Sequence, residues 1–64
     1  MDLAERISGL RTARKLSQDG LARLADLPIS TLRAIEQRAT TDPKLSTVRK
    51  LAAALGVKPS RLVD

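Results

Sequence analysis

Residues 16–37, LSQDGLARLADLPISTLRAIEQ, constrain the fold more than any other part of the chain. Apolar residues recur at helical spacing first around Leu21 and then around Leu32, with polar residues between them. Residues 26–28 interrupt this spacing with Asp-Leu-Pro, because aspartate tolerates left-handed backbone angles and proline fits the first turn of a helix but not its interior. The pattern therefore predicts two short helices joined by a tight turn.

The rest of the chain is predicted to be helix and loop as well. Asp2 followed by Glu5 is typical of a capping box, so a first helix should begin there and continue to about residue 15. Polar residues 38–44 have the composition of a loop. The other helices are predicted over residues 18–25, 29–37, 45–55 and 59–63. With no strand pattern, repeat or linker, residues 1–64 are expected to form a single all-α domain of five helices.

The core of this domain should collect one apolar face from each helix. It should be built from Leu, Ile, Val and Ala, because the chain contains no cysteine, histidine or aromatic residue. In the first and fourth helices these faces are predicted to consist of Leu3, Ile7, Leu10, Leu45, Val48, Leu51, Ala52 and Leu55. Gly56 is a natural end for the fourth helix. Leu24 and Ile29 fall beside the predicted faces, so each is either additional core or an exposed residue with a purpose.

The net charge of the chain indicates what kind of molecule it binds. Twelve Lys and Arg against seven Asp and Glu give a net charge of +5. In so small a domain this excess favours a polyanionic partner such as nucleic acid, although the same charge also serves to keep a small protein in solution. Without histidine or cysteine, metal binding by imidazole or thiolate is excluded, and we expect neither a metal nor a cofactor.

Several fragments of the sequence together resemble the phage repressor and Cro-like (XRE-type) helix-turn-helix family, over almost the whole chain. These fragments are Leu16-Ser17-Gln18, Leu21-Ala22, Ser30-Thr31-Leu32, Ile35-Glu36 and the run LAAALGV at residues 51–57. The resemblance implies a compact five-helix lambda-repressor-like domain with its helix-turn-helix at about residues 17–37. It also implies cytoplasmic DNA binding and, usually, transcriptional repression.

The resemblance assigns the bases to the helix predicted over residues 29–37, whose N-terminal part would enter the major groove. The residues that match base-contacting positions are Ile29, Ser30, Arg33 and Ala34. Arg33 is the best candidate, because a guanidinium can donate two hydrogen bonds to guanine O6 and N7. Ser30 can bond a base or a phosphate, whereas Ile29 and Ala34 offer only contact with a thymine methyl group. The alternative for Arg33 is an ordinary solvated arginine on a helix.

A second set of residues matches positions that hold the DNA backbone. It comprises Ser17, Gln18, Gln37, Arg38, Thr40 and Lys44. Gln18 resembles the family glutamine that grips a phosphate at a helix N-terminus, while Ser17 also fits a plain helix cap. Arg38 and Lys44 flank the predicted loop, and the alternative for both is an ordinary charged loop.

Two further features concern structure and specificity. Arg11 and Glu36 match a family ion pair that joins the first helix to the third, and we assign them a structural role. The turn departs from the family pattern: Asp26 replaces a usual glycine, Pro28 replaces a hydroxyl cap, and Gly20 stands where an acidic residue is common. These departures affect base recognition more than DNA binding itself, and DNA shape could supply part of the discrimination.

The sequence argues against an enzyme and against a membrane protein. It has no glycine-rich phosphate loop, and its two glutamates, Glu5 and Glu36, are accounted for by a cap and an ion pair. No apolar run reaches membrane-spanning length, and the N-terminus carries acidic residues where a signal peptide is basic. We therefore expect a soluble, unexported, cytoplasmic protein.

The leading hypothesis is a sequence-specific regulator, a repressor that binds a pseudo-palindromic operator in double-stranded DNA as a homodimer. Leu62 and Val63 in the predicted fifth helix would supply the dimer contact or would instead complete the monomer core. The alternative hypothesis is a protein-interaction module of the same fold, such as an antitoxin or a coactivator-like adaptor. The operator sequence, the regulated genes, any inducer and the oligomeric state in solution stay open, as does whether a longer natural chain contains this domain.

Overall fold

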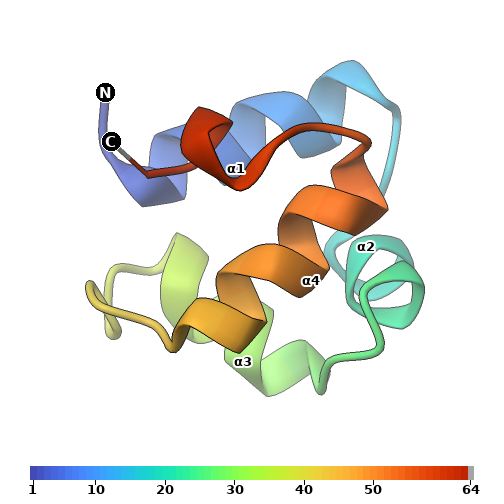
Figure 1. The fold of residues 1–64 in the computed structure, drawn as a ribbon. Helices are drawn as coiled ribbons and strands as arrows, with labels where there is room; N and C mark the ends of the chain where they lie inside the picture. The colour runs from blue at the N-terminus through green and yellow to red at the C-terminus, as the bar shows by residue number, and fades with distance from the viewer. Residues whose placement is uncertain (64) are drawn as a thin grey trace.

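The computed structural model describes residues 1–63, which form four α-helices and one turn of 3₁₀ helix (Figure 1). These elements are α1 (Leu3–Ala13), α2 (Gln18–Leu24), α3 (Ile29–Glu36), α4 (Leu45–Leu55) and η1 (Pro59–Arg61). The described chain contains no strand, and none of its helices combines the length and apolar character needed to cross a bilayer. The all-α class is therefore confirmed.

The predicted fifth helix is wrong, since only the 3₁₀ turn η1 forms there. The amides of Arg61 and Leu62 donate to the carbonyls of Lys58 and Pro59, each three residues back. This tighter turn brings Leu62 onto the core, where its side chain is buried, instead of continuing along a helix axis. The first helix is also shorter than predicted, because it ends at Ala13 instead of about residue 15.

The first two helices begin with side-chain caps, as their sequences predict. Asp2 Oδ1 accepts a hydrogen bond from the Glu5 amide at 2.9 Å, and the Glu5 carboxylate accepts from the Asp2 amide, which completes the capping box. Ser17 Oγ accepts from the Gly20 amide at 2.9 Å. In contrast, the residues before α3 and α4, Pro28 and Lys44, give these helices no side-chain cap.

Each of the four α-helices in residues 1–63 ends in the same way, with a left-handed residue just beyond it. These residues are Lys15, Asp26, Arg38 and Gly56, with φ between 56° and 71°. The amide that follows each of them donates to a carbonyl five residues back, for example Leu27 to Ala22 and Ala39 to Ala34, both at 2.9 Å. Asp26 and Gly56 were expected to end helices, whereas Lys15 and Arg38 carry side chains that give no such signal.

The core lies where the helices meet: α1 packs against α3 and α4, α2 packs against α3 and α4, and η1 closes over α4. Its fully buried large side chains are Ile7, Leu21, Leu32, Ile35, Leu51, Leu55 and Leu62. The prediction for Leu45 is wrong, because this side chain is 57% exposed. Leu45 is the first residue of α4, and helical side chains lean toward the N-terminus, so it extends past the end of the helix.

Candidate nucleic-acid interface

The exposed side of α3 carries most of the residues assigned to the bases. Ser30 and Arg33 are exposed there, Ala34 is half-buried, and Leu32 and Ile35 face the core from the opposite side. Ile29 does not share this position, because it is half-buried and packs against the core cluster. It is therefore largely an additional core residue, one of the two alternatives that its spacing left open.

Arg33 has the features that a base-contacting side chain needs. It lies in the middle of the eight-residue helix α3, so regular helical backbone precedes and follows it. Its side chain is exposed, and its guanidinium has no hydrogen-bond or ion-pair partner within residues 1–63. All five of its N–H donors are thus available to a partner outside the domain.

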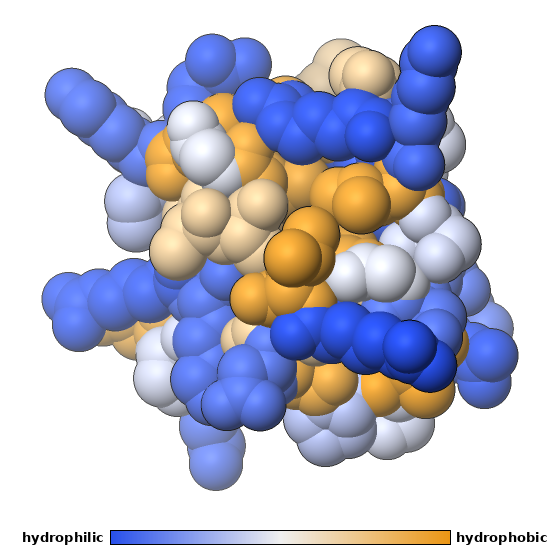
Figure 2. All heavy atoms as spheres, turned by 90° about the vertical axis from the view of Figure 1, so that its right-hand side faces the viewer, coloured by the Kyte–Doolittle hydropathy of each residue, from blue (hydrophilic) through white to orange (hydrophobic). Residues whose placement is uncertain are grey.

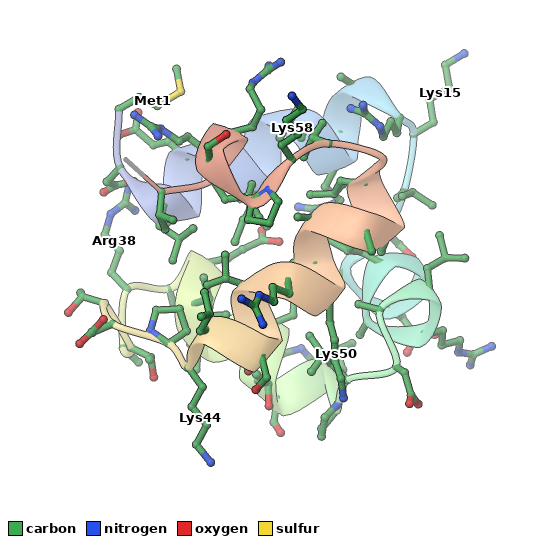
Figure 3. The ribbon with its side chains drawn as sticks, in the orientation of Figure 1. Met1, Lys15, Arg38, Lys44, Lys50 and Lys58 are labelled. Atoms are coloured by element: carbon green, nitrogen blue, oxygen red, sulfur yellow. The ribbon has the colours of Figure 1, made fainter. Side chains whose placement is uncertain are left out.

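A groove between α3 and the start of α4 brings together four of the predicted contact residues. Its lining consists of Ser30, Thr31, Ala34, Ile35, Thr40, Pro43, Lys44 and Thr47. The loop is folded back onto α3, because the amides of Ala39 and Thr40 both donate to the Ala34 carbonyl. Lys44, at the start of α4, extends away from the body of the domain (Figure 3). Sequence reasoning missed Thr31 and Thr47, although Thr47 lies one helical turn after Lys44.

Gln18 and Ser17 both have partners inside the domain. The Ser17 hydroxyl accepts the hydrogen bond that caps α2, which is the plainer of its two predicted roles. Gln18 is half-buried, and its Nε2 donates to Glu36 Oε1 at 3.3 Å. That bond fixes the amide group of Gln18 at the first position of α2 and uses one of its two Nε2 hydrogens. The other hydrogen remains available beside the first amides of the helix, of which the Ser17 cap occupies only that of Gly20.

Glu36 is also the acceptor for Arg11, which joins α1 to α3 by two hydrogen bonds. Arg11 Nε donates to Glu36 Oε2 at 2.9 Å, and Nη2 donates to Glu36 Oε1 at 3.0 Å. The remaining nitrogen, Nη1, donates to the Leu16 carbonyl at 2.8 Å. The two side chains are only 15% and 9% exposed, so the pair is largely removed from water. It fixes the C-terminal end of α3 against α1.

Arg38, the first residue of the predicted phosphate-binding loop, is directed toward α1 instead of away from the domain (Figure 3). Its Nε donates to Asp2 Oδ2 at 2.7 Å and its Nη2 donates to Asp2 Oδ1 at 3.2 Å. Glu5 Oε1 lies 3.8 Å from the same Nη2. The hydrogen bond from Arg38, helped by the bond from the Glu5 amide, holds the pKa of Asp2 below its usual value.

Apolar side chains are exposed on another side of the molecule. Leu24, on α2, is 62% exposed, and Leu27 in the following turn is only partly buried. Figure 2, which views the side on which α2 lies, shows apolar side chains gathered near the middle of that face between long polar ones. Leu24 is therefore the exposed residue of the two whose position the sequence left open.

Comparison with known proteins places this geometry in a family. A helix-turn-helix family model matches residues 3–62. The immunity repressor protein of Bacillus phage phi105 is 43% identical over 63 residues, which cover 98% of this chain and 43% of that repressor. The chain thus corresponds to less than half the length of this relative.

Two solved structures are similar across nearly their whole length. The restriction-modification controller protein C.AhdI from Aeromonas hydrophila is 37% identical with a TM-score of 0.88, and the match covers 94% of this chain and 89% of that one. The N-terminal DNA binding domain of SinR from Bacillus subtilis is 31% identical with a TM-score of 0.93, covering 97% and 90%. This chain therefore belongs to the phage repressor and Cro-like helix-turn-helix family of DNA-binding domains.

Proposed function

We propose that this domain is a sequence-specific transcriptional repressor that binds a pseudo-palindromic operator as a homodimer, with α3 in the major groove. The observation that carries the proposal is Arg33, an exposed guanidinium without an internal partner on the outer side of α3. A helix inserted in the major groove presents such a residue to base edges, where guanine offers two acceptors at the spacing of two guanidinium donors.

The residues around Arg33 are suited either to DNA bases or to the DNA backbone. Ser30 lies one turn earlier on the same exposed side and offers a hydroxyl to a base or a phosphate. Thr40 and Lys44, across the groove, offer a hydroxyl and a positive charge to the DNA backbone. Gln18 would approach a second phosphate at the N-terminus of α2, with its side chain braced by Glu36. Ile29, half-buried, is left as a minor contributor to base recognition.

A dimer is supported by the size of the domain. Two recognition helices on one face of B-DNA must lie about 34–36 Å apart, one turn of the duplex. The domain measures 23 × 22 × 20 Å, so this spacing exceeds the width of one copy but not that of two copies side by side. Leu62 completes the monomer core with 1% exposure, and Val63, 38% exposed, is the apolar residue that this segment offers to a second copy.

Selection of bound sites from random duplexes tests the proposal. We expect enrichment of one sequence that occurs as two inverted half-sites, about one helical turn between their centres. Binding that depends on salt but enriches no sequence would contradict a specific regulator, because phosphate contacts alone carry no sequence information.

Replacing Arg33 with alanine should weaken binding to the selected site by about 1–3 kcal/mol, roughly five- to 150-fold, and should relax the preference at one base pair of each half-site. The measurement is a titration of labelled duplexes that differ at single positions. Arg49→Ala is the matched control, because it removes another exposed helix arginine, on α4, that has no internal partner. If Arg33→Ala weakens all duplexes equally, as a lost phosphate contact would, Arg33 is not the base-contacting residue.

The protein-interaction module is a second candidate because of the exposed Leu24. A domain that uses α2 to hold a partner should lose that partner on Leu24→Ser while its fold is kept, since an exposed leucine contributes little to the core. The two functions are separable in one experiment. Loss of sequence-selective DNA binding on Arg33→Ala, with no effect of Leu24→Ser, would exclude the adaptor as the main function.

A further inference from the structure

The pairing of Arg38 with Asp2 calls for an explanation that folding does not supply. Arg38 has a φ of 62°, in the left-handed region where a residue with a side chain is strained by about 1–2 kcal/mol. The side chains of Arg38 and Asp2 are 53% and 50% exposed, and a pair so exposed contributes little to stability. The backbone does not require arginine here, because glycine would end α3 with less strain and Lys15 and Asp26 end two other helices in the same conformation.

The charges around Arg38 leave it poorly suited to hold a phosphate. Its guanidinium faces two carboxylates, Asp2 within 2.7 Å and Glu5 within 3.8 Å. The two carboxylates offset the positive charge of Arg38, while the N-terminal ammonium also acts on Asp2. Two of the three guanidinium nitrogens, Nε and Nη2, are directed at these carboxylates. A phosphate that approaches Arg38 therefore meets a guanidinium whose donors are already directed at two carboxylates and must compete with them.

The position of this cluster makes the competition relevant to DNA. Arg38 is followed directly by Ala39 and Thr40, whose amides fold back onto α3, and Thr40 lines the same groove as Lys44. A second hollow, lined by Asp2, Thr40 and Thr41 together with Arg38, connects the start of α1 with this loop. The Asp2 carboxylate thus lies beside the segment to which the DNA backbone is assigned.

We propose that Asp2 competes with the DNA backbone for Arg38 and thereby sets the affinity of the domain for DNA without changing its sequence preference. The inference rests on the proposed DNA-binding function. Asp2 is accordingly an affinity-determining residue that itself touches no DNA. Arg38 contributes to phosphate binding only when it leaves α1.

The test is Asp2→Asn, which removes the charge but keeps the cap, because asparagine caps helices as well as aspartate does. We expect about a three- to tenfold gain in affinity for a mixed-sequence duplex at roughly 0.1 M salt, and a salt dependence steeper by about one unit, which correspond to one additional phosphate contact. Asp42→Asn is the matched control, since Asp42 is an exposed carboxylate of the same loop without an internal partner. It makes the same change in net charge and should leave the salt slope unchanged.

Repeating Asp2→Asn in an Arg38→Gln background separates competition from simple charge. The gain should disappear there, because it depends on a released Arg38. A gain that persists without Arg38, or one that Asp42→Asn reproduces, would overturn the proposal in favour of net charge. Weaker binding by Asp2→Asn would also overturn it, since Asp2 would then hold the loop in its binding position.

A measurement without DNA tests the pairing itself. Arg38→Gln should raise the pKa of Asp2 toward its usual value, because the largest cause of its lowered pKa is the hydrogen bond from Arg38. Carbon NMR of the Asp2 carboxyl group during a pH titration would detect this shift, and an unchanged pKa would refute the pairing. If the unaltered domain binds no duplex even at low salt, the proposed function fails as well. Binding without an effect of Asp2→Asn refutes only this inference.

Discussion

Glu36→Gln should lower the free energy of unfolding by about 3–5 kcal/mol, because it leaves the Arg11 guanidinium largely out of water without its counter-charge. Glu36 accepts two hydrogen bonds from Arg11 and a third from Gln18. A glutamine has only one acceptor oxygen and no charge, so these three bonds cannot all be kept. A domain of this size has roughly 3–10 kcal/mol of stability in total, and the variant should be close to unfolding at room temperature. Urea denaturation followed by helical circular dichroism measures the change.

Glu5→Gln is the matched control for this prediction. Its carboxylate is exposed and lies 3.8 Å from Arg38, and glutamine can still complete the capping box with Asp2. We expect a change within about 0.5 kcal/mol, as for exposed ion pairs in general. A similarly small loss for Glu36→Gln would show that the Arg11 pair is not effectively buried.

Replacing both partners separates the net contribution of the ion pair to the free energy of unfolding from the cost of leaving one buried charge unpaired. Arg11→Met combined with Glu36→Leu removes both charges at a largely buried site, where apolar side chains of similar size are often tolerated without loss. The double variant should therefore be more stable than Glu36→Gln alone. Its DNA affinity should nevertheless fall, because Gln18 loses the acceptor that fixes its amide group.

The arrangement of the helices was predictable because its signals are local. Asp2 with Glu5 marks the start of α1, and Ser17 marks the start of α2; each cap bonds an amide only three residues away. Gly56 marks the end of α4, because glycine readily adopts the left-handed conformation found there. The C-terminal bound of α4 agrees with the prediction for this reason, and its start at Leu45 agrees with the end of the polar loop in the sequence. Ser30 and Arg33, which the family resemblance assigned to the bases, share the exposed side of α3.

The remaining features depend on contacts between distant parts of the chain. The Arg38 to Asp2 pair joins residues 36 positions apart, and no spacing rule predicts it. Thr47 enters the groove only because α4 begins beside α3 after the loop. Leu45 has the apolar character of a core residue, but its burial depends on what covers the first turn of α4, and nothing in residues 1–63 does. Local sequence patterns thus predict the helices, whereas the contacts between distant residues of the candidate site depend on how the helices pack.

Leu62→Ala should destabilise the domain by about 2–5 kcal/mol, the usual range for a fully buried leucine. Leu62 is 1% exposed and belongs to the same core cluster as Leu51 and Leu55 of α4. Truncation would open a cavity under η1 that this short turn, fixed by its bonds to Lys58 and Pro59, cannot readily collapse to fill. Thermal unfolding of the variant beside the unaltered domain measures the loss.

The dependence on protein concentration decides between the two roles that the sequence allowed for this segment. Because Leu62 belongs to the monomer core, the loss in stability should be the same at every protein concentration. A dimer contact would instead make the loss grow with concentration, because mass action couples folding to association.

Val63→Ala is the control, since Val63 is 38% exposed and should change monomer stability by about 0.5 kcal/mol or less. If Val63→Ala weakens cooperative binding to the paired half-sites while Leu62→Ala acts only through stability, neighbouring residues perform the two tasks separately. That division follows from the 3₁₀ turn, which directs Leu62 inward and leaves Val63 at the surface.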